Sequence, residues 1–173
     1  MNTDIVVPNG NEEAFTQMAQ KLGYTSLIYA YEKNPKEIKV NLPHQIALFS
    51  AKPGKYLLIG QSCMDLEKGK IDFLTNLELE AAQDKHHHRQ SGLNQVYSVM
   101  AKKQKTVYCV NLHLLITSKE PEKILGRMMQ NVRLCRKYGI EIQIFSFATN
   151  PYEMRSPKDM QAFGRVLGIR KTI

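Results

Sequence analysis

The sequence contains few of the residues from which common functional centres are built. Its three cysteines, Cys63, Cys109 and Cys135, lie far apart and include no CxxC pair. This spacing argues against a zinc site or a disulfide framework, and it fits a reducing compartment such as the cytoplasm. The sequence also has no G-x-S-x-G, no H-E-x-x-H and no glycine-rich phosphate loop. It therefore lacks the usual signatures of a hydrolase, a metallopeptidase or a nucleotide-binding enzyme.

Long apolar runs are missing as well. No stretch approaches the roughly 20 apolar residues that a membrane-spanning helix needs. No basic segment followed by an apolar one resembles a signal peptide. We therefore expect no membrane partner. The length of 173 residues and the hydrophobic content of 43% predict a single globular domain over residues 1–173, large enough to bury a core.

Arginine is absent from the first half of the chain. Residues 1–86 carry 9 lysines and 11 acidic residues, a net charge of −2, whereas residues 87–173 carry 15 basic and 5 acidic residues, a net charge of +10. All seven arginines lie in this second half: Arg89, Arg127, Arg133, Arg136, Arg155, Arg165 and Arg170. A guanidinium group binds phosphate through several donors and stacks on bases. The asymmetry favours a polyanionic partner, although a solvated basic face without a partner has the same composition.

Strand-like and helix-like patterns alternate along the chain. Strands are expected at 3–7, 26–31, 46–50, 56–59, 71–74, 106–112 and 142–147, and helices at 12–22, 91–103, 121–139 and 157–167. The strands at 46–50 and 56–59 are joined by a short segment with Pro53-Gly54, which predicts a hairpin without a helix. The expected fold class is α/β, most simply a barrel or an incomplete one, shortened to about seven strands, with the helix between strands three and four missing.

The helix expected at 121–139 has a clear two-sided pattern. Its apolar residues recur at helical spacing from Ile124 to Cys135 and predict a side that faces the core. The polar residues fall opposite this stripe or at its edges: Arg127, Gln130, Asn131, Arg133, Arg136 and Lys137. Arg127 and Asn131 are expected at an edge. A cationic helix face can follow a phosphate backbone, but an ordinary solvated face has the same pattern.

A second basic segment runs from Asp84 to Asn94 and contains the run His86–His88 and Arg89. If a helix begins near Ser91, its free N–H groups and Arg89 together form an anion site. The histidine run suggests a metal site, but three adjacent side chains do not converge on one ion in an ordinary loop. No other residue has the spacing of a metal ligand. We expect a polar surface loop without a metal.

A third segment lies between the last expected strand and the last expected helix. In it, Ser156 is expected to cap the helix, with Pro157 at the first helical position and Asp159 completing an S-x-x-D box. Arg155 precedes the cap and is expected to be exposed. Because loops that follow the strands of a barrel lie on one rim, this loop and the one at 84–94 are expected to share that rim.

Three of these segments resemble ribonuclease P protein component 3. They are His87–Val96, Arg127–Gly139 and Asn150–Asp159, the last followed by Phe163–Gly168. The motifs occur in the family's order and with plausible spacing, and together they span about residues 84–169. The resemblance implies a TIM-barrel-like fold related to the PHP metallo-phosphoesterases. It also implies a subunit of the ribonucleoprotein that cleaves the 5′ leader from precursor tRNA.

The resemblance further implies partners and site residues. RNA is the catalyst of that enzyme, so the expected role is non-catalytic, without a cofactor, and in contact with precursor tRNA only indirectly. The implied partners are the ribonuclease P RNA and a small RRM-like protein subunit, in a heterotetramer. The implied RNA-binding residues are Arg89, Ser91, Asn94, Arg127, Asn131, Arg133, Arg136, Lys137 and Arg155.

The alternative function is that of a PHP-like, metal-dependent phosphoesterase that uses the His86–His88 run. The PHP pattern calls for H-x-H at the end of the first strand. This chain has Asp4-Ile-Val-Val-Pro8 at that place, which argues against such a hydrolase.

Overall fold

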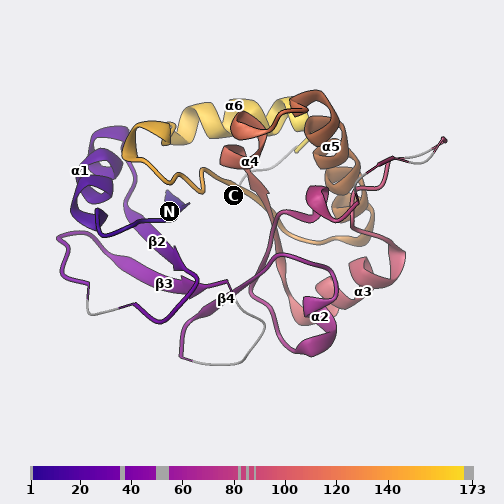
Figure 1. Ribbon diagram of the computed structural model, residues 1–173, viewed down its shortest axis with the longest axis horizontal. Coiled ribbons are helices and arrows are strands. Elements are labelled where there is room, and N and C mark those ends of the chain that lie inside the picture. The colour runs from indigo at the N-terminus through magenta and orange to yellow at the C-terminus, as the bar shows by residue number, and fades with distance from the viewer. Residues whose placement is uncertain are drawn as a thin grey trace.

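The computed structural model describes residues 2–35, 38–49, 55–81, 83–84, 86–87 and 89–169. Its seven strands form one sheet in chain order (Figure 1): β1 (Thr3–Val6), β2 (Ser26–Tyr31), β3 (His44–Leu48), β4 (Leu57–Gly60), β5 (Phe73–Leu74), β6 (Val107–Asn111) and β7 (Ile142–Phe145). Every neighbouring pair is parallel. The predicted fold class, a shortened TIM-barrel-like α/β domain, is confirmed.

The four expected helices are present in the described residues, together with two short ones that the sequence did not predict. The expected helices are α1 (Glu12–Leu22), α3 (Gln95–Gln104), α5 (Pro121–Tyr138) and α6 (Pro157–Leu167). The additional ones are α2 (Asp65–Lys68) and α4 (Leu112–Thr117), and two 3₁₀ turns span Leu77–Leu79 and Pro151–Glu153. Within the described part of the chain, none of these helices has the length and apolar character needed to cross a bilayer.

The hairpin expected between the third and fourth strands is wrong. Ala47 pairs with Leu57 and Leu48 with Leu58 in parallel register. Both strands also pair with parallel neighbours, β2 and β5, so an antiparallel turn would break the uniform direction of the sheet. The described residues between β3 and β4 contain no helix, as predicted, whereas Pro53-Gly54 lies outside the described residues.

The barrel closes where β1 and β7 end. Val7 donates its N–H to the Ala148 carbonyl at 2.9 Å, and Phe147 donates its N–H to the Ile5 carbonyl at 2.8 Å. Next to these bonds, the side chain of Asp4 replaces main-chain pairing, because its carboxylate accepts bonds from the Ser146 N–H at 2.7 Å and the Ser146 hydroxyl at 2.6 Å. The chain therefore forms a nearly closed seven-stranded barrel.

The Asp4 carboxyl is fully buried, and burial raises its pKa from 3.8 to about 7. Since the folded pKa lies above the unfolded one, Asp4 favours the folded state at low pH, and this contribution is lost as pH rises from about 4 to 7.

Asp4→Asn keeps the hydrogen-bond geometry and removes the titration. As the pH rises from 5 to 8, we expect the unfolding free energy of the wild type to fall relative to that of the variant. Urea unfolding measures it, and an identical difference at both pH values would contradict the prediction.

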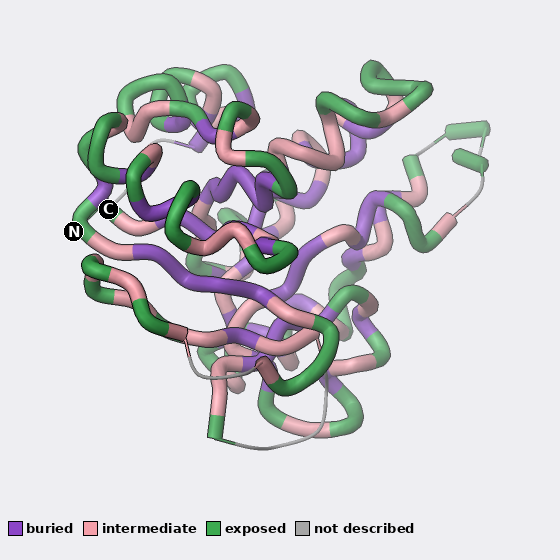
Figure 2. The backbone as a smooth tube through the Cα atoms, turned by 60° about the vertical axis from the view of Figure 1, so that its left-hand side comes forward, coloured by how far each residue is buried: buried purple, intermediate pink, exposed green. Residues whose placement is uncertain are grey.

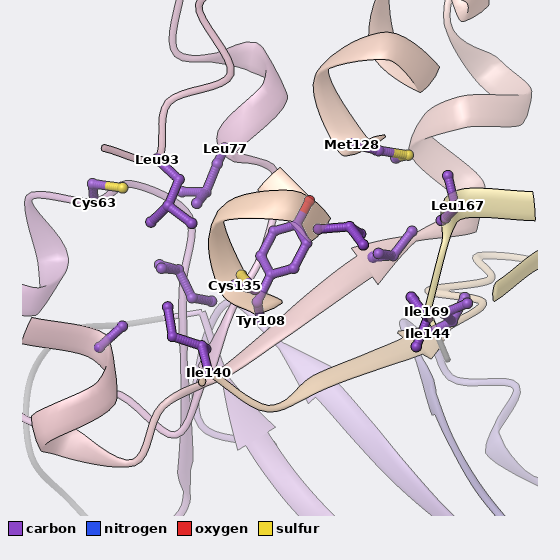
Figure 3. Close-up of a cluster of buried hydrophobic side chains, with 14 of the residues drawn as sticks. Cys63, Leu77, Leu93, Tyr108, Met128, Cys135, Ile140, Ile144, Leu167 and Ile169 are labelled. Carbon is purple, nitrogen blue, oxygen red and sulfur yellow. The ribbon is translucent and has the colours of Figure 1, made fainter. Parts of the chain in front are cut away.

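The largest apolar cluster lies between strands β4 to β7 and helices α3, α5 and α6 (Figure 3). Tyr108 of β6 and Met128 of α5 are buried in it. All three cysteines are free and buried, and burial raises the pKa of their thiols. In Figure 2, buried residues follow the strands, whereas exposed residues lie on the outer sides of the helices and in the loops. This core fixes the inner side of α5 and thereby orients its outer side.

Candidate nucleic-acid interface

Helix α5 is the central element of the candidate site. It begins at Pro121, which fits the first helical turn, and ends at Gly139 in a left-handed conformation (φ 67°). Its apolar side, from Ile124 to Cys135, packs into the core. Arg133, Arg136 and Lys137 are exposed on the other side. The predicted two-sided pattern is confirmed for these three cations.

The predicted position of Arg127 at the edge of the exposed face is wrong. Only 2% of Arg127 is exposed. Its Nη1 donates to the carbonyls of Glu78 at 2.6 Å and Ala81 at 2.7 Å, and its Nε and Nη2 lie 2.8 Å from Oδ1 of Asp84. The segment that follows β5 crosses this side of α5 and covers it. Arg127 therefore holds that segment and is not on the surface.

Asn131 is also buried, one helical turn after Arg127. Its Nδ2 donates to the carboxylate of Glu78 at 2.8 Å and to the carbonyl of Ser91 at 2.8 Å. Glu78 is fully buried too and accepts a hydrogen bond from the Tyr108 hydroxyl. Burial raises the pKa of Glu78, and the bonds from Tyr108 and Asn131 offset part of that rise. This network joins α5, β6 and the loop through groups that have little access to solvent.

The loop that carries Arg89 lies directly on α5. Gln130 donates through Nε2 to the Arg89 carbonyl at 2.9 Å. The Arg89 guanidinium packs over Gly126, where a Cβ atom would lie 2.6 Å from its Cζ atom. Gly126 therefore gives Arg89 room that a larger residue would occupy. Arg89 stays exposed, so the structure presents its charge beside the outer side of α5.

The expected helix start near Ser91 is wrong by four residues. Helix α3 begins at Gln95, and the side chain of Asn94 caps it by accepting the Tyr97 N–H at 3.0 Å. Ser91 is 1% exposed, and its hydroxyl has no hydrogen-bond partner among the described residues. The left-handed Gly92 (φ +82°) turns the chain between Ser91 and the helix. Asn94 is exposed, but its side-chain oxygen is already engaged in capping α3.

The loop before α6 agrees with the prediction. Ser156 caps the helix by accepting the Asp159 N–H at 3.2 Å. Arg155 is exposed. Its Nη1 donates hydrogen bonds of 2.9–3.2 Å to three carbonyls of its own turn, those of Tyr152, Glu153 and Met154. Nothing in the described residues joins Arg155 to Arg89 or to α5. The predicted sharing of one rim rests on topology, because both loops follow the C-terminal ends of strands.

The histidines form no metal centre in the described part of the chain, where no group of three or more His, Cys, Asp and Glu side chains could hold an ion. His86 and His87 are exposed with ring centroids 5.7 Å apart, and His88 lies outside the described residues. Nδ1 of His113, in α4, lies 3.1 Å from Oε2 of Glu153, in the 3₁₀ turn that follows β7.

The sequence of the chain is similar to those of known proteins. The chain is 29% identical over 108 residues to ribonuclease P protein component 3 from Methanosarcina mazei, and equally so to that from Methanosarcina acetivorans. Each alignment covers 61% of this chain. The resemblance to ribonuclease P protein component 3 is confirmed. No protein-family model matches the chain.

A solved structure shares the fold of the chain. A chain in the cryo-EM structure of archaeal ribonuclease P with mature tRNA superposes with a TM-score of 0.62 at 16% identity. This superposition covers 94% of the present chain and 82% of the other. At this identity the match supports the barrel fold alone. The aligned region of the curated component 3 proteins is 42% of their length, so the chain matches less than half of each.

Proposed function

We propose that the chain is a non-catalytic protein subunit of ribonuclease P, which cleaves the 5′ leader of precursor tRNA. The observation that carries the proposal is the sequence similarity to component 3. The expected RNA-facing surface comprises Arg89, Asn94, Arg133, Arg136, Lys137 and Arg155, which are all exposed. Ser91, Arg127 and Asn131 are buried and support this surface from beneath.

The mechanism is electrostatic support of a folded RNA. Exposed arginines and lysines neutralise phosphates and release condensed counterions, so binding is tight at low salt and weakens as salt rises. Arg133 and Lys137 are four residues apart on the same side of α5, a rise of about 6 Å along the helix axis. That distance is close to the spacing of successive phosphates along a nucleic-acid strand, so one strand can contact both. Arg89 extends the charge to the first turns of α5, because its guanidinium packs over Gly126.

The proposed partners are the ribonuclease P RNA and other protein subunits of the particle, among them a small RRM-like subunit in a heterotetramer. Precursor tRNA is contacted only indirectly in this proposal. No observation on the described residues or in the comparisons favours the phosphoesterase alternative, and residues 4–8 depart from its first-strand pattern. We further propose that the protein acts where ribonuclease P assembles, in the cytoplasm.

Arg133→Gln combined with Lys137→Gln tests the proposed surface. We expect weaker binding to a transcript of the host's ribonuclease P RNA and a salt slope reduced by about two units, one for each lost phosphate contact. Lys21→Gln combined with Lys33→Gln is the matched control, because it removes two exposed charges from the first half of the chain. The affinity of each variant is measured by fluorescence anisotropy from 50 to 400 mM salt. Equal slopes for the two double variants would contradict the assignment of α5.

A further inference from the structure

We propose that a second RNA-backbone site lies at the C-terminal end of α3, in a hollow lined by Lys70, Met100, Lys103, Gln104 and Lys105. The proposal rests on the proposed function, because it extends the RNA-facing surface beyond α5. The ligand is a phosphodiester group of a folded RNA. None of these residues belongs to the three segments that resemble component 3.

The hollow continues the basic side of α5. Lys102 of α3 donates through Nζ to the carbonyl of Gly139, which ends α5, at 2.6 Å. This bond brings the last turns of the two helices together, and Arg136 and Lys137 lie in the last turn of α5. The proposal therefore places Lys103 and Lys105, at the end of α3, next along an RNA strand that leaves α5 at Lys137.

The charges in the hollow are available to a ligand. Lys103 and Lys105 are exposed and form no ion pair with a described residue. Lys70 lies 3.7 Å from the carboxylate of Asp72 while its side chain remains 74% exposed. No acidic residue lines the hollow itself. Three lysines line the hollow and one neighbouring carboxylate offsets them in part, so the local charge is positive and attracts an anionic group such as a phosphodiester.

The backbone at Lys105 gives an independent reason to expect a function. Helices α1, α5 and α6 all end on a glycine in the left-handed conformation, at Gly23, Gly139 and Gly168. Helix α3 ends on Lys105 in the same conformation, with φ 61°. A residue with a Cβ atom is strained there, whereas glycine is not. Strained positions of this kind occur preferentially at functional sites, so a lysine in place of glycine indicates a use for its charge.

Lys105→Gly combined with Lys103→Gln separates charge from structure. The glycine matches the other helix ends, so we expect a melting temperature equal to or above that of the wild type. In the same anisotropy assay with the ribonuclease P RNA transcript, we expect affinity about tenfold lower near 100 mM salt and a slope reduced by about two units. Lys21→Gln with Lys33→Gln again serves as the control, since α1, which contains Lys21, and β2, which precedes Lys33, lie across the barrel from α3 (Figure 1).

The outcomes distinguish this inference from the proposed function. If the α5 double variant loses affinity while the α3 double variant binds like the control, the α3 site is wrong and the proposed function stands. A melting temperature clearly below that of the wild type would overturn the strain argument at Lys105, and with it the inference. If the wild-type chain does not bind the RNA at any salt concentration, both proposals fail.

Discussion

Gly92→Ala is expected to destabilise the protein by about 3 kcal/mol, because a side chain at this position combines strain with a backbone clash. Gly92 has φ +82°, and a Cβ atom would lie 2.4 Å from the Leu77 carbonyl oxygen. That oxygen belongs to the main chain of the 3₁₀ turn that starts the loop, so it cannot rotate away. Urea unfolding followed by circular dichroism measures the loss.

Gly10→Ala provides the control for this experiment. Gly10 has a similar backbone angle, φ +77°, but no atom lies within 4 Å of the position of its Cβ. We expect it to cost only the conformational strain, about 1 kcal/mol. If the two variants lose equal stability, the close contact between Gly92 and Leu77 is not what fixes the loop.

Arg127→Met is expected to cost about 3 kcal/mol and to release the loop that carries Arg89. Methionine retains the apolar stem, but the carbonyls of Glu78 and Ala81 lose the donor that satisfies them. Each unsatisfied buried acceptor costs about 1–3 kcal/mol. Hydrogen exchange should show faster exchange in residues 77–94 before the rest of the protein opens.

Asp84→Asn tests which partner of Arg127 matters. The Asp84 side chain is 27% exposed, and asparagine keeps an oxygen for Arg127 and for the Gln90 N–H. We expect less than about 1 kcal/mol, as for other ion pairs with access to water. A loss as large as that of Arg127→Met would show that the ion pair, and not the two carbonyls, holds the loop.

The sequence predicted the barrel class and the core-facing side of α5, because each depends on the local period of apolar residues. It did not predict the parallel β3–β4 pair, because strand direction there is set by the neighbours β2 and β5 and not by the connecting segment. The available signal was the pair of continuous apolar runs at 46–49 and 56–59, which are typical of strands in a parallel sheet.

The burial of Arg127 was unpredictable for a related reason. Helical spacing places Arg127 beside the apolar stripe, but its burial depends on a segment about 45 residues earlier that crosses α5. Asn131 donates to Glu78 of the same segment and to the Ser91 carbonyl. Gly126 was the one local signal, since a glycine inside a helix often marks a close approach by another part of the chain. The cations farther along α5 needed no such information, because they are exposed, although Arg136 also donates through Nη1 to the Gly168 carbonyl at 3.2 Å.

The chain is proposed to support a catalytic RNA through its basic surface. The most direct measurement is affinity purification of the chain from its host after ultraviolet crosslinking, with sequencing of the bound RNA and an assay for cleavage of a precursor-tRNA leader. We predict that one structured RNA is enriched together with the cleavage activity, and that both decrease for the Arg133→Gln, Lys137→Gln variant. Recovery of the wild-type chain without an enriched RNA and without that activity would contradict the claim.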